Sequence, residues 1–129
     1  MTPEWAISIR QFWAWAVIHG GKDVENRSLP RRFKAAVGQR VLIHAGLRMT
    51  SDEYSVAVAF MAGLGVRCPA PEQLARGGVI GSVAVVDIVA RYPSSRWWNK
   101  GAHALVLADP QSLPFRPARG QVGLFRVQP

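Results

Sequence analysis

The sequence contains few of the residues that bind metals or form covalent cross-links. Its one cysteine, Cys68, cannot form an internal disulfide, and a zinc site built from several cysteines is excluded. The three histidines, His19, His44 and His103, are too scattered to show a metal-binding spacing. No phosphate-binding loop or dinucleotide fingerprint is present. We therefore expect neither a metal ion nor a cofactor.

Long apolar runs and a leader-like beginning are also lacking. The longest apolar run, residues 77–90, is interrupted by Ser82 and Asp87 and is too short to span a bilayer. Glu4 stands where a signal peptide has its basic region, and Arg10 interrupts the apolar stretch that follows. These features predict a cytoplasmic protein with no membrane partner.

The sequence does contain enough apolar residues for one hydrophobic core. Hydrophobic residues make up 49% of its 129 residues, which predicts a folded domain rather than a disordered chain. A chain of this length has no room for a second core of useful size. Since no linker or internal repeat divides it, we expect a single domain over residues 1–129.

Positive charge predominates. Sixteen Lys and Arg face eight Asp and Glu, and all the cations except Lys22, Lys34 and Lys100 are arginines. A basic domain attracts phosphates over long distances, and arginine adds planar, bidentate hydrogen bonding. The chain is also rich in alanine, glycine and proline, as a GC-rich genome alone would produce. Composition therefore supports a nucleic-acid partner without deciding between these explanations.

The order of apolar segments predicts a mixed domain. We expect helices at 11–19 and 54–64, the second behind a capping box of Thr50 and Glu53, and a short helical segment at 71–76. Strands are predicted at 5–9, 22–27, 40–45, 78–91, 102–108 and 121–127, with a basic loop at 28–38, a loop at 92–101 and a connection at 110–120. Short strands interleaved with a few helices indicate an α+β domain built around a mixed barrel.

Several motifs, all in order along the chain, resemble an ASCH domain of the PUA-like superfamily. Residues 8–15 read SIRQFWAW, and Gly20, Lys22, Glu25 and Arg27 match the pattern G-x-K-x-x-E-x-R. The resemblance continues through VLIHA at 41–45, GGVIGSVAVVD at 77–87, the tryptophan pair 97–98, ALVL at 104–107, LPF at 113–115 and GQVGLF at 120–125. It thus covers essentially the whole chain. The chain departs from it at Phe12, where many relatives carry proline.

The resemblance implies a PUA-like mixed β-barrel with flanking helices and a basic ligand cleft between the barrel and the first helix. Relatives are thought to bind RNA; some hydrolyse acylated cytidine, and others have been linked to RNA cleavage. In the acyl-cytidine hydrolases a lysine at the Lys22 position acts with a threonine three residues later and a distant glutamate. Glu25 stands in place of that threonine, so a nucleoside amidohydrolase would need Glu25 as a general base on water.

The residues themselves point to the same segment. In an extended chain Glu25 and Arg27 project to one face, and a lysine beside a glutamate in a dry cleft can bind a base and a phosphate, or activate a nucleophile. Lys22 and Glu25 are therefore the candidate catalytic residues if the chain is an enzyme. The plain alternative is an exposed ion pair of little energetic value.

Further residues are candidates for ligand contact. Trp13 is either a stacking platform for a base or a core side chain, and His44 is either near the cleft or a core histidine. Of two adjacent indoles in a loop, Trp98 is our preferred stacking residue. The full set of predicted ligand-binding residues is Arg10, Gln11, Trp13, Arg27, Ser28, His44 and Trp98.

Three functions remain open. The first is a module that binds RNA or a modified nucleoside, through cations for phosphate and through tryptophan and Glu25 for the base. The second is a small hydrolase, either a nucleoside amidohydrolase or a ribonuclease, that uses Lys22 and Glu25. The third is a protein-interaction module that docks through Trp97 and Trp98. The expected partner is RNA or a nucleoside-like small molecule, and the sequence does not specify an oligomeric state.

Overall fold

The computed structural model describes residues 5–28 and 30–128. Its elements, in chain order, are β1 (Trp5–Ile9), α1 (Gln11–His19), β2 (Val24–Arg27), the 3-10 helix η1 (Pro30–Ala36), β3 (Arg40–Ala45), α2 (Ser51–Gly63), the 3-10 helix η2 (Pro71–Gln73), β4 (Gly78–Val89), β5 (His103–Pro117) and β6 (Leu124–Arg126). The segment 28–38, predicted as a loop, therefore contains a 3-10 turn around the buried Phe33.

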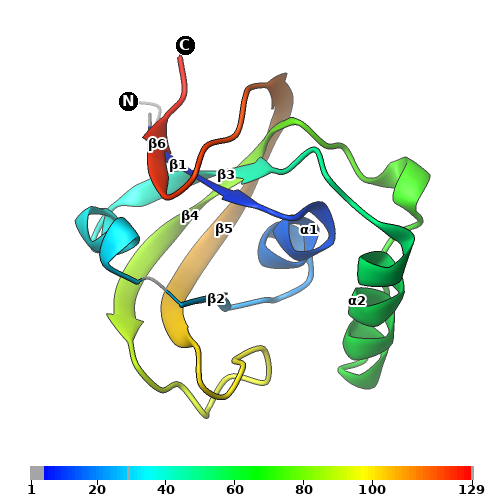
Figure 1. Ribbon diagram of the computed structural model, residues 1–129, viewed down its shortest axis with the longest axis horizontal. Helices are drawn as coiled ribbons and strands as arrows, with labels where there is room; N and C mark the ends of the chain where they lie inside the picture. Colours follow the sequence, from blue (N-terminus) through cyan, green and yellow to red (C-terminus); the bar gives the residue numbers. More distant parts are fainter. Residues whose placement is uncertain (1–4, 29, 129) are drawn as a thin grey trace.

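The six strands form one mixed sheet in the order β2-β5-β4-β3-β1-β6. β1 runs parallel to β3, and the other neighbouring strands are antiparallel. The sheet curls into a half-barrel with α1 in its hollow, while α2 stands beside the open side (Figure 1). The α+β class and the mixed barrel predicted from the sequence are confirmed.

Helix α1 is apolar on nearly all sides because it is packed from two directions. Ala14, Val17 and Ile18 join the core formed by the strands. Phe12 and Ala16 face the other way, into a second cluster that includes Met61 of α2. A helix that is hydrophobic all round must be covered all round. This double packing holds α1 between the strands and α2.

Helix α2 begins three residues before its predicted start. Thr50 is the N-cap, and its hydroxyl accepts a hydrogen bond from the Glu53 amide at 3.2 Å. The capping interaction predicted from Thr50 and Glu53 is thus present, and the helix starts directly after it. No helix in the ranges 5–28 and 30–128 is long and apolar enough to cross a membrane.

Strand β5 is longer than the strand predicted at 102–108. It continues to Pro117, through the segment that was expected to be a connection. Proline cannot donate to a sheet ladder, which is why the segment was predicted not to be a strand. Pro110 and Pro114 lie where the pairing of β5 with β4 shifts register, between Ser82/Ala84 and Val79/Gly81. At such irregularities the missing N–H is tolerated.

Candidate functional site

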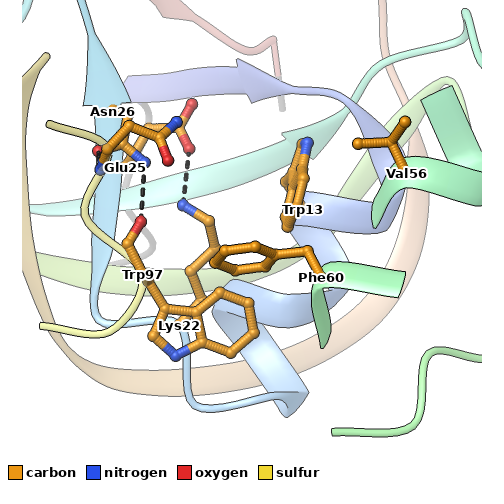
Figure 2. Close-up of a pocket in the computed structure, with 8 residues that line it drawn as sticks. Trp13, Lys22, Glu25, Asn26, Val56, Phe60 and Trp97 are labelled. Carbon is orange, nitrogen blue, oxygen red and sulfur yellow. Dashed lines mark hydrogen bonds and ion pairs between the residues drawn. The ribbon is translucent and has the colours of Figure 1, made fainter. Parts of the chain in front are cut away.

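A cavity of about 290 Å³ opens where α1, β2, α2 and the loop between β4 and β5 meet. All four segments contribute side chains to it (Figure 2). Its lining residues are Trp13, Lys22, Glu25, Asn26, Val56, Phe60, Trp97 and Asn99. We call this cavity the aromatic pocket. It combines three of the predicted site residues, Trp13, Lys22 and Glu25, with five that were not predicted.

Three aromatic rings form one wall of the pocket. The ring centroids of Trp13 and Phe60 are 5.8 Å apart and nearly perpendicular, at 75°. Those of Phe60 and Trp97 are also 5.8 Å apart, at 57°. Because each ring comes from a different element, the wall exists only in the folded chain. The edge-to-face contact of Trp13 with Phe60 and the tilted contact of Phe60 with Trp97 hold the three rings in place.

The opposite side of the pocket is polar and is built on β2. The Lys22 Nζ lies 3.3 Å from Glu25 Oε1 and also donates to the main-chain carbonyl of Val24. The second Glu25 oxygen accepts from Arg27, with Nη2 at 2.9 Å and Nε at 3.0 Å. Lys22 is only 5% exposed and Glu25 9%. The segment is therefore a buried, charge-paired row rather than the exposed ion pair considered as the alternative.

Burial changes the acid–base behaviour of Lys22. Loss of hydration lowers the pKa of its ammonium below the ordinary lysine value, and the charge and hydrogen bond of Glu25 offset this only in part. The Nζ also lies 5.8 Å from the centroid of the Trp13 ring. Lys22 thus joins the polar side of the pocket to its aromatic wall, and its amine loses a proton more readily than a surface lysine does.

The loop carrying Trp97 is tied to β2 by one side chain. Asn26 Nδ2 donates to the Trp97 carbonyl at 2.9 Å, and Asn26 Oδ1 accepts from the Asn99 amide at 2.9 Å. A second tie joins the Ser95 hydroxyl to the Asp23 carboxylate. These bonds hold the loop against the pocket. Asn26 was missed because its neighbours Glu25 and Arg27 carry the recognisable charges; a polar residue between them was the only signal in the sequence.

Two of the predicted ligand-binding residues bond to other parts of the protein instead. Gln11 is 2% exposed; its amide donates to the Ala75 carbonyl and accepts from the Trp15 amide at 3.2 Å. It fastens α1 to the segment before β4. Arg10 is exposed and pairs with Glu53 at 3.0 Å, which joins the start of α1 to the start of α2. Neither residue lines the aromatic pocket.

The two adjacent indoles have different places. Trp97, 7% exposed, lines the aromatic pocket, whereas the predicted stacking residue Trp98 does not. The Trp98 Nε1 donates to the Ala102 carbonyl at 2.8 Å, and its ring packs on the outside of the cluster around α2. Trp98 therefore forms a hydrogen bond within the loop, and Trp97 is the indole of this loop that lines the pocket.

The remaining predicted residues lie beside the pocket or away from it. Arg27 donates to the Ser8 carbonyl at 2.8 Å, and its guanidinium lies 4.9 Å from the Phe33 ring centroid. With the exposed Ser28 it lines a neighbouring hollow. His44, 2% exposed, lines a different cavity. Among the residues that the structure describes, no group of three or more His, Cys, Asp or Glu side chains is placed to hold a metal ion.

Comparison with solved structures finds seven chains of similar shape, among them two of one ASCH protein. The ASCH protein of Zymomonas mobilis has a TM-score of 0.60 and 19% identity, covering 97% of this chain and 87% of its own. A mutant of that protein has a TM-score of 0.58 and 18% identity, covering 98% and 92%. No protein-family model and no curated protein sequence matches the chain. The chain therefore has the fold of ASCH domains, as its motifs led us to expect.

Proposed function

We propose that this chain, whose fold is that of ASCH domains, binds a base of single-stranded RNA or a modified nucleoside in the aromatic pocket. The observation that carries the proposal is the pairing of three ring faces with a buried lysine–glutamate row across one cavity (Figure 2). A planar heterocycle with hydrogen-bonding edges fits both walls at once. Stacking of a base on an aromatic side chain contributes about 1–3 kcal/mol.

The size of the pocket favours a single base or nucleoside. Ligand cavities commonly measure about 300–1,000 Å³, and this pocket of about 290 Å³ lies at the small end. A longer polynucleotide would have to place one base inside and run its backbone along the surface. That geometry is how single-stranded RNA is commonly read, with bases turned out onto aromatic side chains.

The polar wall supplies the groups that distinguish one base from another. Glu25 accepts hydrogen bonds from an amino or imino group, whereas Lys22 donates to a carbonyl oxygen or ring nitrogen. Both side chains are already removed from water, so their hydrogen bonds to a ligand act in a medium of low dielectric constant. Arg27 holds the second Glu25 oxygen and fixes the carboxylate in one orientation.

Cations continue from the pocket along the neighbouring surface. Arg27 and Arg32 line the hollow beside it, and Arg48 and Arg119 line the broad cavity beyond. No Asp or Glu is among the described residues that line these two hollows. A sugar–phosphate backbone leaving the pocket would therefore meet positive charge in this direction. This arrangement favours RNA, rather than an uncharged small molecule, as the ligand.

A hydrolase is the second candidate, and one observation favours it. The pKa of Lys22 is lowered by burial, and its amine touches Glu25. In such a pair Glu25 can act as a general base on water or a hydroxyl, while the Lys22 amine beside it gives up a proton more readily than a surface lysine, as an amidohydrolase or ribonuclease requires. Turnover of an acylated nucleoside or of RNA that disappears in Lys22→Met, with the fold retained, would establish this activity.

The proposal is tested by titrating tryptophan fluorescence with a panel of modified nucleosides and a short single-stranded RNA. Lys22→Met removes the ammonium and keeps the apolar stem; Lys34→Met, at an exposed position of η1, is the control with the same loss of charge. We expect saturable quenching that Lys22→Met weakens at least about tenfold and Lys34→Met leaves nearly unchanged. RNA affinity should fall steeply with salt, whereas nucleoside affinity should not. Equal loss in both variants would contradict the proposal.

A further inference from the structure

A serine and a histidine meet in a second cavity that shares no lining residue with the aromatic pocket. Ser8 lies on β1 and His44 on β3, and the parallel pairing of these strands sets the two residues directly opposite each other. The Ser8 Oγ is 2.9 Å from His44 Nδ1. The sheet register, rather than a flexible loop, therefore brings a hydroxyl to an imidazole.

The other nitrogen of the ring fixes the direction of this hydrogen bond. His44 Nε2 lies 2.7 Å from the main-chain carbonyl of Ala118. A carbonyl only accepts, so the proton of a neutral ring is on Nε2 and the lone pair of Nδ1 faces the Ser8 hydroxyl. Hydroxyl, imidazole and an acceptor behind the ring are the parts of an activated serine nucleophile, with the carbonyl holding the tautomer.

The hydroxyl is open to a ligand from one side. Ser8 and His44 both line a cavity of about 900 Å³ between the segment after β3 and the segment before β6. Two glycines border the approach. A Cβ at Gly120 would lie 3.0 Å from Ser8 Oγ and 2.8 Å from His44 Cε1, and one at Gly46 would lie 3.8 Å from Ser8 Oγ. Any side chain at position 120 would crowd the pair, so glycine there keeps it accessible.

We propose that Ser8 and His44 form a separate hydrolytic site for acyl esters that carry an anionic group. The same cavity is lined by Arg48 and Arg119, which suit a carboxylate or phosphate on the substrate. Leu47 and Val122, 73% and 79% exposed, give its rim an apolar surface for the carbon chain. No acidic side chain is among the described residues that line it.

The chemistry follows from the hydrogen bonds. Ser8 Oγ bonds to the ester carbonyl carbon while its proton passes to His44 Nδ1, and the carbonyl electron pair moves onto oxygen. The tetrahedral intermediate then collapses and its bond to the leaving alkoxide breaks. The alkoxide takes the proton from Nδ1. Water then loses a proton to Nδ1 and attacks the acyl carbon. The bond to Ser8 breaks, Oγ regains the proton, and a carboxylic acid leaves.

The test uses the full chain with a fluorophosphonate label, 4-nitrophenyl butyrate and 4-nitrophenyl succinate. We expect mass spectrometry to find the phosphonate on Ser8, and faster hydrolysis of the succinyl ester. Ser8→Ala should lower ester hydrolysis at least about hundredfold, and Ser112→Ala, at an exposed position on β5, should leave it unchanged.

Labelling at another residue, or unchanged hydrolysis by folded Ser8→Ala, would overturn the proposal; a preference for the butyryl ester would overturn its substrate class. Labelling of the unaltered chain keeps the test decisive even where a variant folds poorly. Nucleoside binding should survive Ser8→Ala, because Arg27 contacts the Ser8 main-chain carbonyl and not its hydroxyl. Nucleoside binding in the aromatic pocket and ester hydrolysis at Ser8 therefore succeed or fail independently.

Discussion

Lys22 shows how the burial of a single charged side chain can lower stability. Its ammonium is buried beside one carboxylate that already has Arg27 as a partner. Removing the charge therefore does not leave Glu25 unpaired, and it ends the cost of keeping an ammonium out of water. A residue whose burial costs stability and whose side chain faces a pocket is more readily explained by binding or catalysis than by folding.

The first prediction concerns the loss of stability caused by burying the Lys22 ammonium. At pH 7, Lys22→Met should leave the free energy of unfolding unchanged or raise it by about 1 kcal/mol. The folded pKa of Lys22 is lowered, so between that pKa and the ordinary lysine value the unfolded chain binds more protons. The stability of the unaltered chain relative to Lys22→Met should thus rise as the pH is raised from 7 towards about 10.

Urea unfolding of both proteins across this pH range measures the difference. A loss of more than about 2 kcal/mol in Lys22→Met at pH 7 would instead mean that Lys22 holds the fold together. A difference that stays flat with pH would show that burial does not lower its pKa.

At the scale of elements, the pocket depends on a loop that owes its position to hydrogen bonds. The segment between β4 and β5 contains no regular structure over residues 90–102, yet it supplies Trp97 to the aromatic wall. Asn26 holds it through two bonds of 2.9 Å, one to the Trp97 carbonyl and one from the Asn99 amide. Binding loops placed by a rigid scaffold in this way are common.

The second prediction follows from that tie. Asn26→Ala should destabilise the protein by about 1–3 kcal/mol, the cost of two lost bonds at a partly buried position, and should weaken nucleoside binding. Amide exchange should become faster in the loop while β1 and β3 stay protected. Gln111→Ala, at an exposed site on β5, is the control. Unchanged exchange in the loop would show that Ser95 and Asp23 suffice to hold it.

The elements were predictable wherever local signals agree. Strands β1, β3 and β4 and helix α1 were found close to their true bounds because apolar residues fill them and Gly20 ends the helix. The end of β5 was missed because its prolines signal a break, and only the bulged pairing with β4 makes room for them. The sequence motif singled out Lys22 and Glu25. It could not say which of two adjacent indoles turns inward, or that Phe60 of α2 would face Trp13.

At the scale of the whole molecule, the half-barrel carries two chemically different cavities that share no lining residue. The row from Lys22 through Glu25 and Arg27 ends on the main chain of Ser8, whose side chain serves the other cavity. The chain has a net charge of +8, and four of its arginines line the two hollows outside the aromatic pocket: Arg27, Arg32, Arg48 and Arg119. Both the base-binding proposal and the ester-hydrolysis proposal follow from where the sheet places these few side chains.

The central claim, that a base enters the aromatic pocket, is tested most directly by the indole N–H signals of the five tryptophans. A nucleoside that quenches fluorescence is added stepwise while two-dimensional nitrogen–proton spectra are recorded. We expect large, saturating shifts for Trp13 and Trp97, which line the pocket, and small ones for Trp5 and Trp98, which do not. Saturating shifts confined to Trp5 or Trp98, or none at Trp13 and Trp97, would contradict the claim.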